Sequence, residues 1–395
     1  MKISDHKGLL IFLCCLGSAL SAGGVSAEPF IPKSDDVVLE TLPRTLSGGD
    51  SPLADLSEWL ADDPRNLTAA SQLAREYITL GRRRSDPRYF GYAQAALAPW
   101  WDEPRPPPEV LLLRATLLQN RHEFEAALED LNALLEIQPR NAQAWLTRAV
   151  VHQVTGDYQQ AMRDCLNLAQ LTGGVAPGIC IGNVLAVSGH AGRAYDLLRQ
   201  AALGARDPAL QQWALTSMAQ IKMRQGEVEA AARHFEQALQ AGPRSPYLLR
   251  VYADFLLDRG RAEQVLKLLK DETRDDALLL RAAIAARDAG REALAKKYVA
   301  MLEDRFREAR LRGDWRHVRD AALFELELQD DAEQALQYAA RNWRLQKAPE
   351  DALMLLQAAV AANDLMAARP VIEWMKRYGI EDVRLQALLK NGKVE

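Results

Sequence analysis

The sequence has 395 residues, of which 48% are hydrophobic and 26% are charged, and its formal net charge is −4. A mildly acidic chain with interspersed charges lacks the basic stripe that nucleic-acid binding needs, which argues against that class of protein. The hydrophobic content is ample for a core, and a chain of this length forms either two or three globular domains or one continuous repeat array.

Residues 1–27 have the pattern of a cleaved secretory signal peptide. Lys2 and Lys7 make a basic n-region, residues 8–20 an apolar h-region, and residues 25–27 supply the small side chains of a cleavage site. No later segment approaches the roughly 20 continuous apolar residues of a membrane span. The sequence therefore predicts a protein that is exported to the periplasm and has no transmembrane segment after cleavage.

A lipoprotein signal is the alternative, because Cys14 and Cys15 lie in this region. They follow Phe and Leu instead of the small residues of a lipobox, which disfavours lipidation. The leader at 28–50 is predicted to be extended and flexible. Its Val-Val-Leu at 37–39 is a candidate to dock on the rest of the chain or on a partner.

The segment 51–107 is predicted to form an irregular helical hairpin followed by a connector. Helices are expected over 67–80 and 88–97, joined by an enlarged basic turn, GRRRSDP. The prolines of APWWDEPRPPPEV at 98–110 favour a rigid extended connector. Its two tryptophans are expected to cap the hairpin and not to bind a ligand.

From residue 108 to residue 271, large and small side chains alternate with a period near 34 residues. The clearest copy has Ala149, then Gly156 and Asp157 at a turn, then Ala161. Glycine can take the left-handed conformation that ends a first helix, and aspartate can cap the second. Small residues at 149 and 161 let the two helices approach closely. Further copies span 111–139, 215–243 and 249–269, and a copy shifted by one residue spans 176–201.

This pattern resembles the tetratricopeptide repeat. The resemblance implies an all-α fold, a right-handed α-solenoid of stacked antiparallel helical hairpins, in which large residues such as Trp145 and Tyr158 fill the space between successive hairpins. The sequence departs from the family pattern at Arg114 and Arg148, where a leucine is usual. We expect these first helices to be offset slightly or to carry the charge at an edge.

Residues 272–395 are predicted to form degenerate hairpins of similar length, with a capping helix at the end. The expected hairpins pair 277–289 with 291–311, 317–328 with 332–346, and 352–362 with 365–378, and the capping helix covers 382–390. Terminal repeats of an array are atypical because one side of them faces water.

Two cysteines remain after signal cleavage, Cys165 and Cys180. An even number in an oxidising compartment permits one disulfide. The alternative is two buried, unpaired thiols that act as small apolar side chains.

The sequence contains no motif that brings catalytic groups together. HExxH, GxSxG, CxxC and a phosphate-binding glycine loop are all absent, so we expect no enzyme activity, no cofactor and no metal. The segment 313–328 concentrates charge around one tryptophan. It predicts either an interlocked surface network at a stack junction or a local anion or partner site, and a hydrolase or metal enzyme centred on His317 is the remaining alternative.

The family resemblance places a binding groove along the first helices of successive repeats, and a protein or peptide partner in it. An envelope or inner-membrane protein is the expected partner, and the alternative is an accessory of polysaccharide synthesis or export that binds a glycan or a synthase. The residues carried over to the groove are Gln119, Asn120, Gln143, Gln153, Asn183, Trp213, Gln220, Arg224, Tyr247, Arg250 and Asp254.

Overall fold

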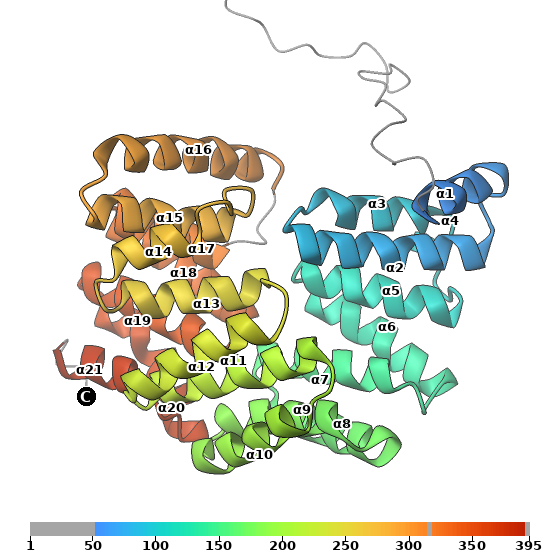
Figure 1. Ribbon diagram of the computed structural model, residues 1–395, viewed down its shortest axis with the longest axis horizontal. Helices are drawn as coiled ribbons and strands as arrows, with labels where there is room; N and C mark the ends of the chain where they lie inside the picture. Colours follow the sequence, from blue (N-terminus) through green and yellow to red (C-terminus); the bar gives the residue numbers. More distant parts are fainter. Residues whose placement is uncertain (1–51, 314–317, 392–395) are drawn as a thin grey trace, which may run out of the picture. The chain divides into compact units, whose positions relative to one another are not determined.

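The computed structural model describes residues 52–313 and 318–391, which form α-helices joined by short turns (Figure 1). No β-strand occurs in these two ranges, which agrees with the prediction of an all-α helical-repeat solenoid. The predicted signal peptide and leader lie outside the described residues. None of the described helices is long and apolar enough to cross a membrane.

The N-terminal part contains two helices more than the two that the sequence predicts. Its helices are α1 (Pro52–Asp62), α2 (Leu67–Arg84), α3 (Arg88–Ala96) and the short α4 (Ala98–Trp101). Trp100 is buried in the core of this part and Trp101 packs against the same core, as expected of side chains that cap a hairpin. The predicted extended connector is wrong at its start, because α4 occupies the first four residues of it.

The predicted basic turn is also wrong over its first half. Residues Gly81 to Arg84 continue α2, which ends only at Ser85 in a left-handed conformation. Arginine is a good helix former, and positive charge at a helix C-terminus is favoured by the helix dipole. The arginines therefore extend the helix, and the turn is correspondingly short.

Five antiparallel hairpins follow, and each predicted repeat is a pair of helices. They are α5 (Pro108–Asn120) with α6 (Phe124–Ile137), α7 (Ala142–Thr155) with α8 (Tyr158–Thr172), α9 (Val175–Ala186) with α10 (Ala191–Gly204), α11 (Pro208–Arg224) with α12 (Val228–Ala241), and α13 (Pro246–Leu257) with α14 (Ala262–Leu268). Gly156 ends α7 with a φ of 88°, and the Asp157 side chain accepts a hydrogen bond from the Gln160 backbone N–H. Ala149 and Ala161 are buried, so the predicted packing of this turn is confirmed.

The arginines that depart from the repeat pattern are paired across the hairpin and are not left at an edge. Arg114 contacts Asp130 at 2.7 Å and Arg148 contacts Asp164 at 2.8 Å. Each pair joins residues 16 apart, on the first and second helices of one repeat. Both carboxylates are buried, so each guanidinium satisfies a charge that would otherwise be costly to bury.

The C-terminal part continues the hairpins. Its helices are α15 (Asp276–Asp288), α16 (Glu292–Leu311), α17 (Val318–Leu328), α18 (Ala332–Leu345), α19 (Pro349–Ala361), the 3₁₀ helix η2 (Leu365–Ala368), α20 (Arg369–Tyr378) and α21 (Val383–Asn391). The last predicted hairpin helix is therefore split. Pro370 has no backbone N–H, which suits the first turn of a new helix and not the interior of a longer one.

Candidate partner-binding hollow

The C-terminal helices fold back onto the repeats instead of only extending the stack. One hydrophobic core joins side chains of α7, α8 and α9 with side chains of α17 to α21. The Lys347 backbone N–H donates to the Val154 carbonyl at 2.8 Å, and the Tyr158 hydroxyl donates to the Lys347 carbonyl at 2.8 Å. Tyr158 thus contacts the C-terminal part, whereas the repeat pattern predicts that it fills the space before the next hairpin.

The contact follows the turns between the two helices of successive repeats. A Cβ built on Gly156 would come within 2.8 Å of the Lys347 side chain, and one on Gly189 within 3.0 Å of the Tyr378 carbonyl. The turn at Gly226 faces Val383 in the same way. These turn glycines therefore serve two purposes: they end a helix, and they leave room for the returning chain.

The predicted capping helix, α21, also contacts the repeats and does not only cap the end of the stack. Arg384 of α21 reaches the Met223 sulfur at 3.8 Å and the Asp258 carboxylate at 3.8 Å, on α11 and at the end of α13. The helix thus contacts the middle of the array as well as its neighbour α19. It closes one side of the repeats.

A hollow of about 630 Å³ remains between the repeats and the returning chain. Eight predicted groove residues line it: Asn120, Gln153, Asn183, Trp213, Gln220, Arg224, Tyr247 and Arg250. The opposite wall includes Arg319 and Asp320 of α17 and residues from Asn342 to Glu350, which span the end of α18, the turn after it and the start of α19. The repeat pattern does not predict this wall.

Three predicted groove residues lie elsewhere. Asp254 lines a second, smaller hollow of about 190 Å³ that Arg250 also borders. Gln119 and Gln143 line neither space, and Gln143 is an exposed residue that donates to the Thr147 hydroxyl of its own helix. Nine of the eleven residues that the resemblance assigns to a groove thus line one of the two hollows.

The larger hollow offers aromatic surface and amide groups. Trp213 is half-buried in its wall, and Tyr247, which is 47% exposed, donates from its hydroxyl to the Gln220 side-chain oxygen at 3.0 Å. Gln220 in turn donates to the Glu350 carboxylate at 3.3 Å across the hollow. Gln153 and Asn183 have no hydrogen bond among the described side chains, so their donors and acceptors are available to a ligand.

Arg250 and Arg319 are cations that line both hollows, and Arg250 is the one with an unsatisfied donor. Its guanidinium lies over the Tyr247 ring at 5.4 Å, and its buried Nη1 has no hydrogen-bond partner in the described part of the chain. Burial lowers the pKa of Arg250, and the nearby charges of Arg319 and Arg281 lower it further. An unsatisfied buried donor of this kind is costly, so it marks a position where a ligand atom is favoured.

The floor of the smaller hollow is a buried ion-pair network. Arg281 donates to Asp254 at 2.7 Å and to Asp320 at 2.5 Å. Burial alone would raise the pKa of Asp320, but the charges of Arg281 and Arg319 hold it well below its usual value. Each charge in this network is paired with an opposite charge, which favours a structural role over a catalytic one.

The charged segment at 313–328 contributes to this interior. Arg319 contacts Asp351 at 3.2 Å, and Asn342 donates to the same carboxylate at 2.8 Å. For residues 318–328 of this segment, the structure agrees with the predicted network at a junction. The network is buried, however, and does not lie on the surface as predicted. His317, the centre of the alternative enzyme hypothesis, lies outside the described residues.

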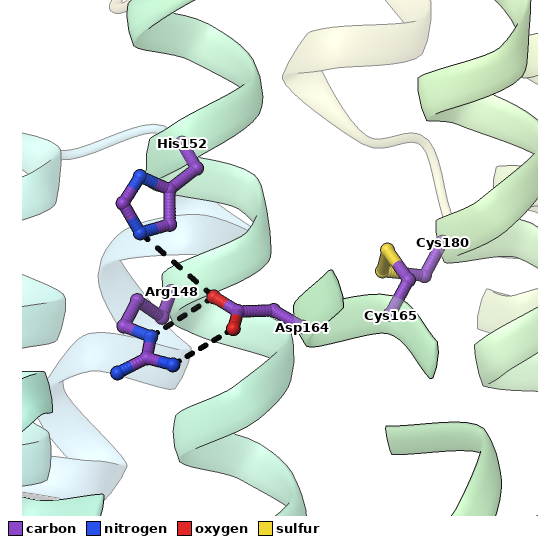
Figure 2. The surroundings of a disulfide bond; sticks show 5 residues. All are labelled: Arg148, His152, Asp164, Cys165 and Cys180. Carbon is purple, nitrogen blue, oxygen red and sulfur yellow. Dashed lines mark hydrogen bonds and ion pairs between the residues drawn. A yellow bond between two sulfur atoms is a disulfide. The ribbon is translucent and has the colours of Figure 1, made fainter. Parts of the chain in front are cut away.

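The two cysteines lie beside one of the repeat ion pairs, and Figure 2 shows their surroundings. Cys165 of α8 and Cys180 of α9 are joined as a disulfide, with a Cα–Cα distance of 5.6 Å. Both residues are buried. Asp164, next to Cys165, accepts from Arg148 and lies 3.9 Å from the His152 ring. The bridge ties one repeat to the next at the place where the C-terminal part docks.

The fold and the hollow together define a helical-repeat scaffold of the kind that binds proteins. Residues 112–174 and 222–277 match sequence models of the tetratricopeptide repeat. These two segments contain tetratricopeptide repeats, as the residue pattern predicts. No curated protein matches the sequence of this chain significantly.

Several solved structures are similar in fold at low sequence identity. A chain of the Cut9–Hcn1 tetramer of the APC/C is 16% identical over 78% of this chain, with a TM-score of 0.38, and this chain covers 52% of its length. A thermophilic repeat protein of Thermus thermophilus, TTC0263, is 21% identical, with a TM-score of 0.39, over 48% of this chain and 98% of its own. The type IV pilus biogenesis factor PilW is 18% identical, with a TM-score of 0.40, over 50% and 93% respectively.

Proposed function

We propose that this chain is a non-catalytic adaptor of the periplasm, which holds an extended segment of a protein partner in the larger hollow during envelope assembly or export. The observation that carries the proposal is the hollow itself. Eight residues that the repeat pattern assigns to a binding groove line one space of about 630 Å³. Spaces of roughly 300–1,000 Å³ are typical of ligand sites.

The chemistry of the lining suits a polypeptide backbone. Gln153 and Asn183 offer amide donors and acceptors at a spacing set by two rigid helices, α7 and α9. Trp213 and Tyr247 add ring surface, and Arg250 adds a cation, which are the side chains that most often dominate protein interfaces. The binding energy would thus come from a few anchoring side chains in one hollow.

The returning C-terminal part limits how a partner is held. A segment bound in the hollow has repeats on one side and the residues from Asn342 to Glu350 on the other. We therefore expect an inserted loop or chain end of limited length. A long peptide laid along an open groove does not fit this arrangement.

The disulfide supports a periplasmic location. Bridges of this kind persist in oxidising compartments such as the periplasm and are rare in the cytosol. The sequence pattern of residues 1–27 supports the same compartment, although those residues lie outside the described part.

Site-specific photo-crosslinking tests the proposal. A photoreactive phenylalanine analogue is placed at Trp213, and in a control variant at Trp59, an exposed tryptophan of α1. The proposal requires a crosslink to an envelope protein from position 213 and none to that protein from position 59. The captured protein is then purified, and its binding to Trp213→Ala and to Trp59→Ala is compared by calorimetry. Equal affinity of both variants and the unmodified chain would refute the proposal.

One observation favours a second candidate, a glycan-binding accessory of polysaccharide synthesis or export. Trp213 shares the hollow with free amides, and a ring beside amide groups can stack on a sugar and hydrogen-bond to its hydroxyls. Titration of oligosaccharides against tryptophan fluorescence separates the two candidates. Quenching that Trp213→Ala abolishes would support the glycan.

A further inference from the structure

A second surface with the composition of an interface lies at the α2–α3 turn. We call it the Tyr–Arg face, and it consists of Tyr77, Tyr89, Tyr92, Arg82, Arg83, Arg84 and Arg88. The three tyrosine rings contact one another, with centroid distances of 5.6 Å for Tyr77–Tyr92, 5.8 Å for Tyr89–Tyr92 and 6.1 Å for Tyr77–Tyr89. Ring packing of this kind fixes the side chains in place before any partner arrives.

The arginines differ in how far they are neutralised. Arg88 pairs with Asp86 at 2.7 Å, and Arg84 donates to the Tyr89 hydroxyl at 2.6 Å while lying over its ring. Arg82 and Arg83 are exposed and have no ion pair or hydrogen bond among the described residues. The face therefore carries an excess of positive charge on a chain whose overall charge is negative.

The α14–α15 loop adds to this positive charge. The pKa of Asp86 is lowered chiefly by its hydrogen bond with Arg88, but the charge of Arg274 contributes as well. Arg274, an exposed residue, therefore lies within electrostatic reach of the turn. Positive charge near the Tyr–Arg face thus comes from both elements.

We propose that the Tyr–Arg face binds an acidic segment of a protein partner, at a site separate from the hollow. Arginine and tyrosine are enriched in protein interfaces, and a positive surface attracts and orients a negative partner. The tyrosines supply contact area at little cost in conformational entropy, because they are already packed. Arg82 and Arg83 are available to form ion pairs with acidic side chains of the partner.

A membrane surface fits the face less well than a protein does. Peripheral membrane binding uses exposed leucine, phenylalanine or tryptophan side chains that enter the lipid, as well as basic residues. Tyr92, at 43% exposure, is the only large hydrophobic residue of the face that is exposed, and Tyr77 and Tyr89 are partly buried. The Tyr–Arg face can therefore form ion pairs with a partner, but it has few exposed apolar side chains that could enter a lipid membrane.

Fluorescence anisotropy with a defined probe tests the proposal. The probe is a labelled peptide in which glutamate alternates with glycine, and its comparison has glutamine in place of each glutamate. We expect the full mature chain to bind the acidic probe and not the neutral one, and the affinity to fall as salt rises to about 0.3 M. Arg82→Glu combined with Arg83→Glu should weaken binding by about tenfold or more.

The controls separate this proposal from charge in general and from the hollow. Arg163→Glu combined with Arg193→Glu reverses two exposed arginines of α8 and α10 and should leave the affinity unchanged. Tyr92→Ala should weaken binding and Trp213→Ala should not. Failure of the acidic probe to bind, equal loss with both arginine pairs, or binding only to vesicles of phosphatidylglycerol would overturn the proposal. None of these results bears on the crosslink from position 213.

Discussion

The indole N–H of Trp374 donates a hydrogen bond to the Tyr158 hydroxyl at 3.1 Å, although 216 residues separate them in the sequence. The same hydroxyl donates to the Lys347 carbonyl, and the Tyr378 ring lies against the Tyr158 ring with centroids 4.6 Å apart. A single side chain at the start of α8 thus joins a repeat to α20 and to the segment before α19.

Replacing Tyr158 with phenylalanine should weaken this junction. The substitution keeps the ring but leaves the Trp374 N–H and the Lys347 carbonyl without their partner in a buried place. We expect a loss of about 2 kcal/mol in the free energy of unfolding, measured with urea. Tyr92→Phe, on an exposed side chain, should change it by less than about 0.5 kcal/mol. Equal effects of the two substitutions would show that the hydroxyl of Tyr158 is not used.

The ion pair between Arg148 and Asp164 should be costly to break on one side only. Asp164→Ala leaves a largely buried guanidinium without its carboxylate, and we expect a loss of about 3–5 kcal/mol. The double substitution Arg148→Met with Asp164→Leu should recover most of that loss. Glu263→Ala, which removes a partner of the exposed Arg291, should cost about 1 kcal/mol or less. A double variant as unstable as the single one would contradict this account.

Stability should fall as pH drops through the range in which histidine titrates. Burial lowers the pKa of His152, although Asp164 and Asp157 act in the opposite direction. Because its pKa in the folded state is below the value of 6.5 for the unfolded chain, the unfolded chain binds the proton more readily. The contribution of neutral His152 to the free energy of unfolding is complete above about pH 6.5. It is lost as the pH falls from there towards the pKa of His152 in the folded state.

The variant His152→Gln should remove that part of the pH dependence. Urea unfolding of the variant and of the parent at several values between about pH 7.5 and pH 5.5 gives the two slopes, and the parent should have the steeper one. His190→Gln, at an exposed position, is the matched control. Parallel slopes for the His152 variant and the parent would show that this imidazole is not responsible.

Reduction of the Cys165–Cys180 bridge should destabilise the docking region. The bridge spans 15 residues, for which the chain-entropy relation gives about 3 kcal/mol. Without reductant, we expect neither thiol to react with a maleimide under native conditions, and after reduction both should react once the protein is unfolded. Cys165→Ala with Cys180→Ala should match the reduced protein in stability. Labelling of two thiols in the untreated native protein would contradict the bridge.

The repeat pattern predicted local structure well because it records contacts between neighbours in sequence. Gly156, Asp157 and the two alanines of that hairpin have the roles their spacing indicates. The pairing of Arg114 with Asp130 was also present in the sequence, since Arg148 and Asp164 repeat it one period later. The family pattern marks the two arginines only as exceptions and indicates no partner for either of them.

The return of the C-terminal part could not be predicted in this way. Hydrophobic periodicity shows that Tyr158 and Trp374 each lie on a buried face, but it does not show which distant face each one meets. The hollow was therefore predicted from one wall only, and the residues from Asn342 to Glu350 were missed. The arginines of α2 were misjudged for another reason, since a run of charges was interpreted as a turn although arginine favours helix.

The docking of Lys347, Tyr378 and Val383 along the glycine turns has a consequence for the order of assembly. In a simple solenoid each hairpin is finished once the next one has formed, so synthesis and folding can advance together. Here the hairpins of α7 to α12 stay uncovered until the segment from Lys347 to Val383 has been made. A nonsense mutation before Lys347 would leave the repeats at 108–271 in place, but without the wall that the returning segment adds to the hollow.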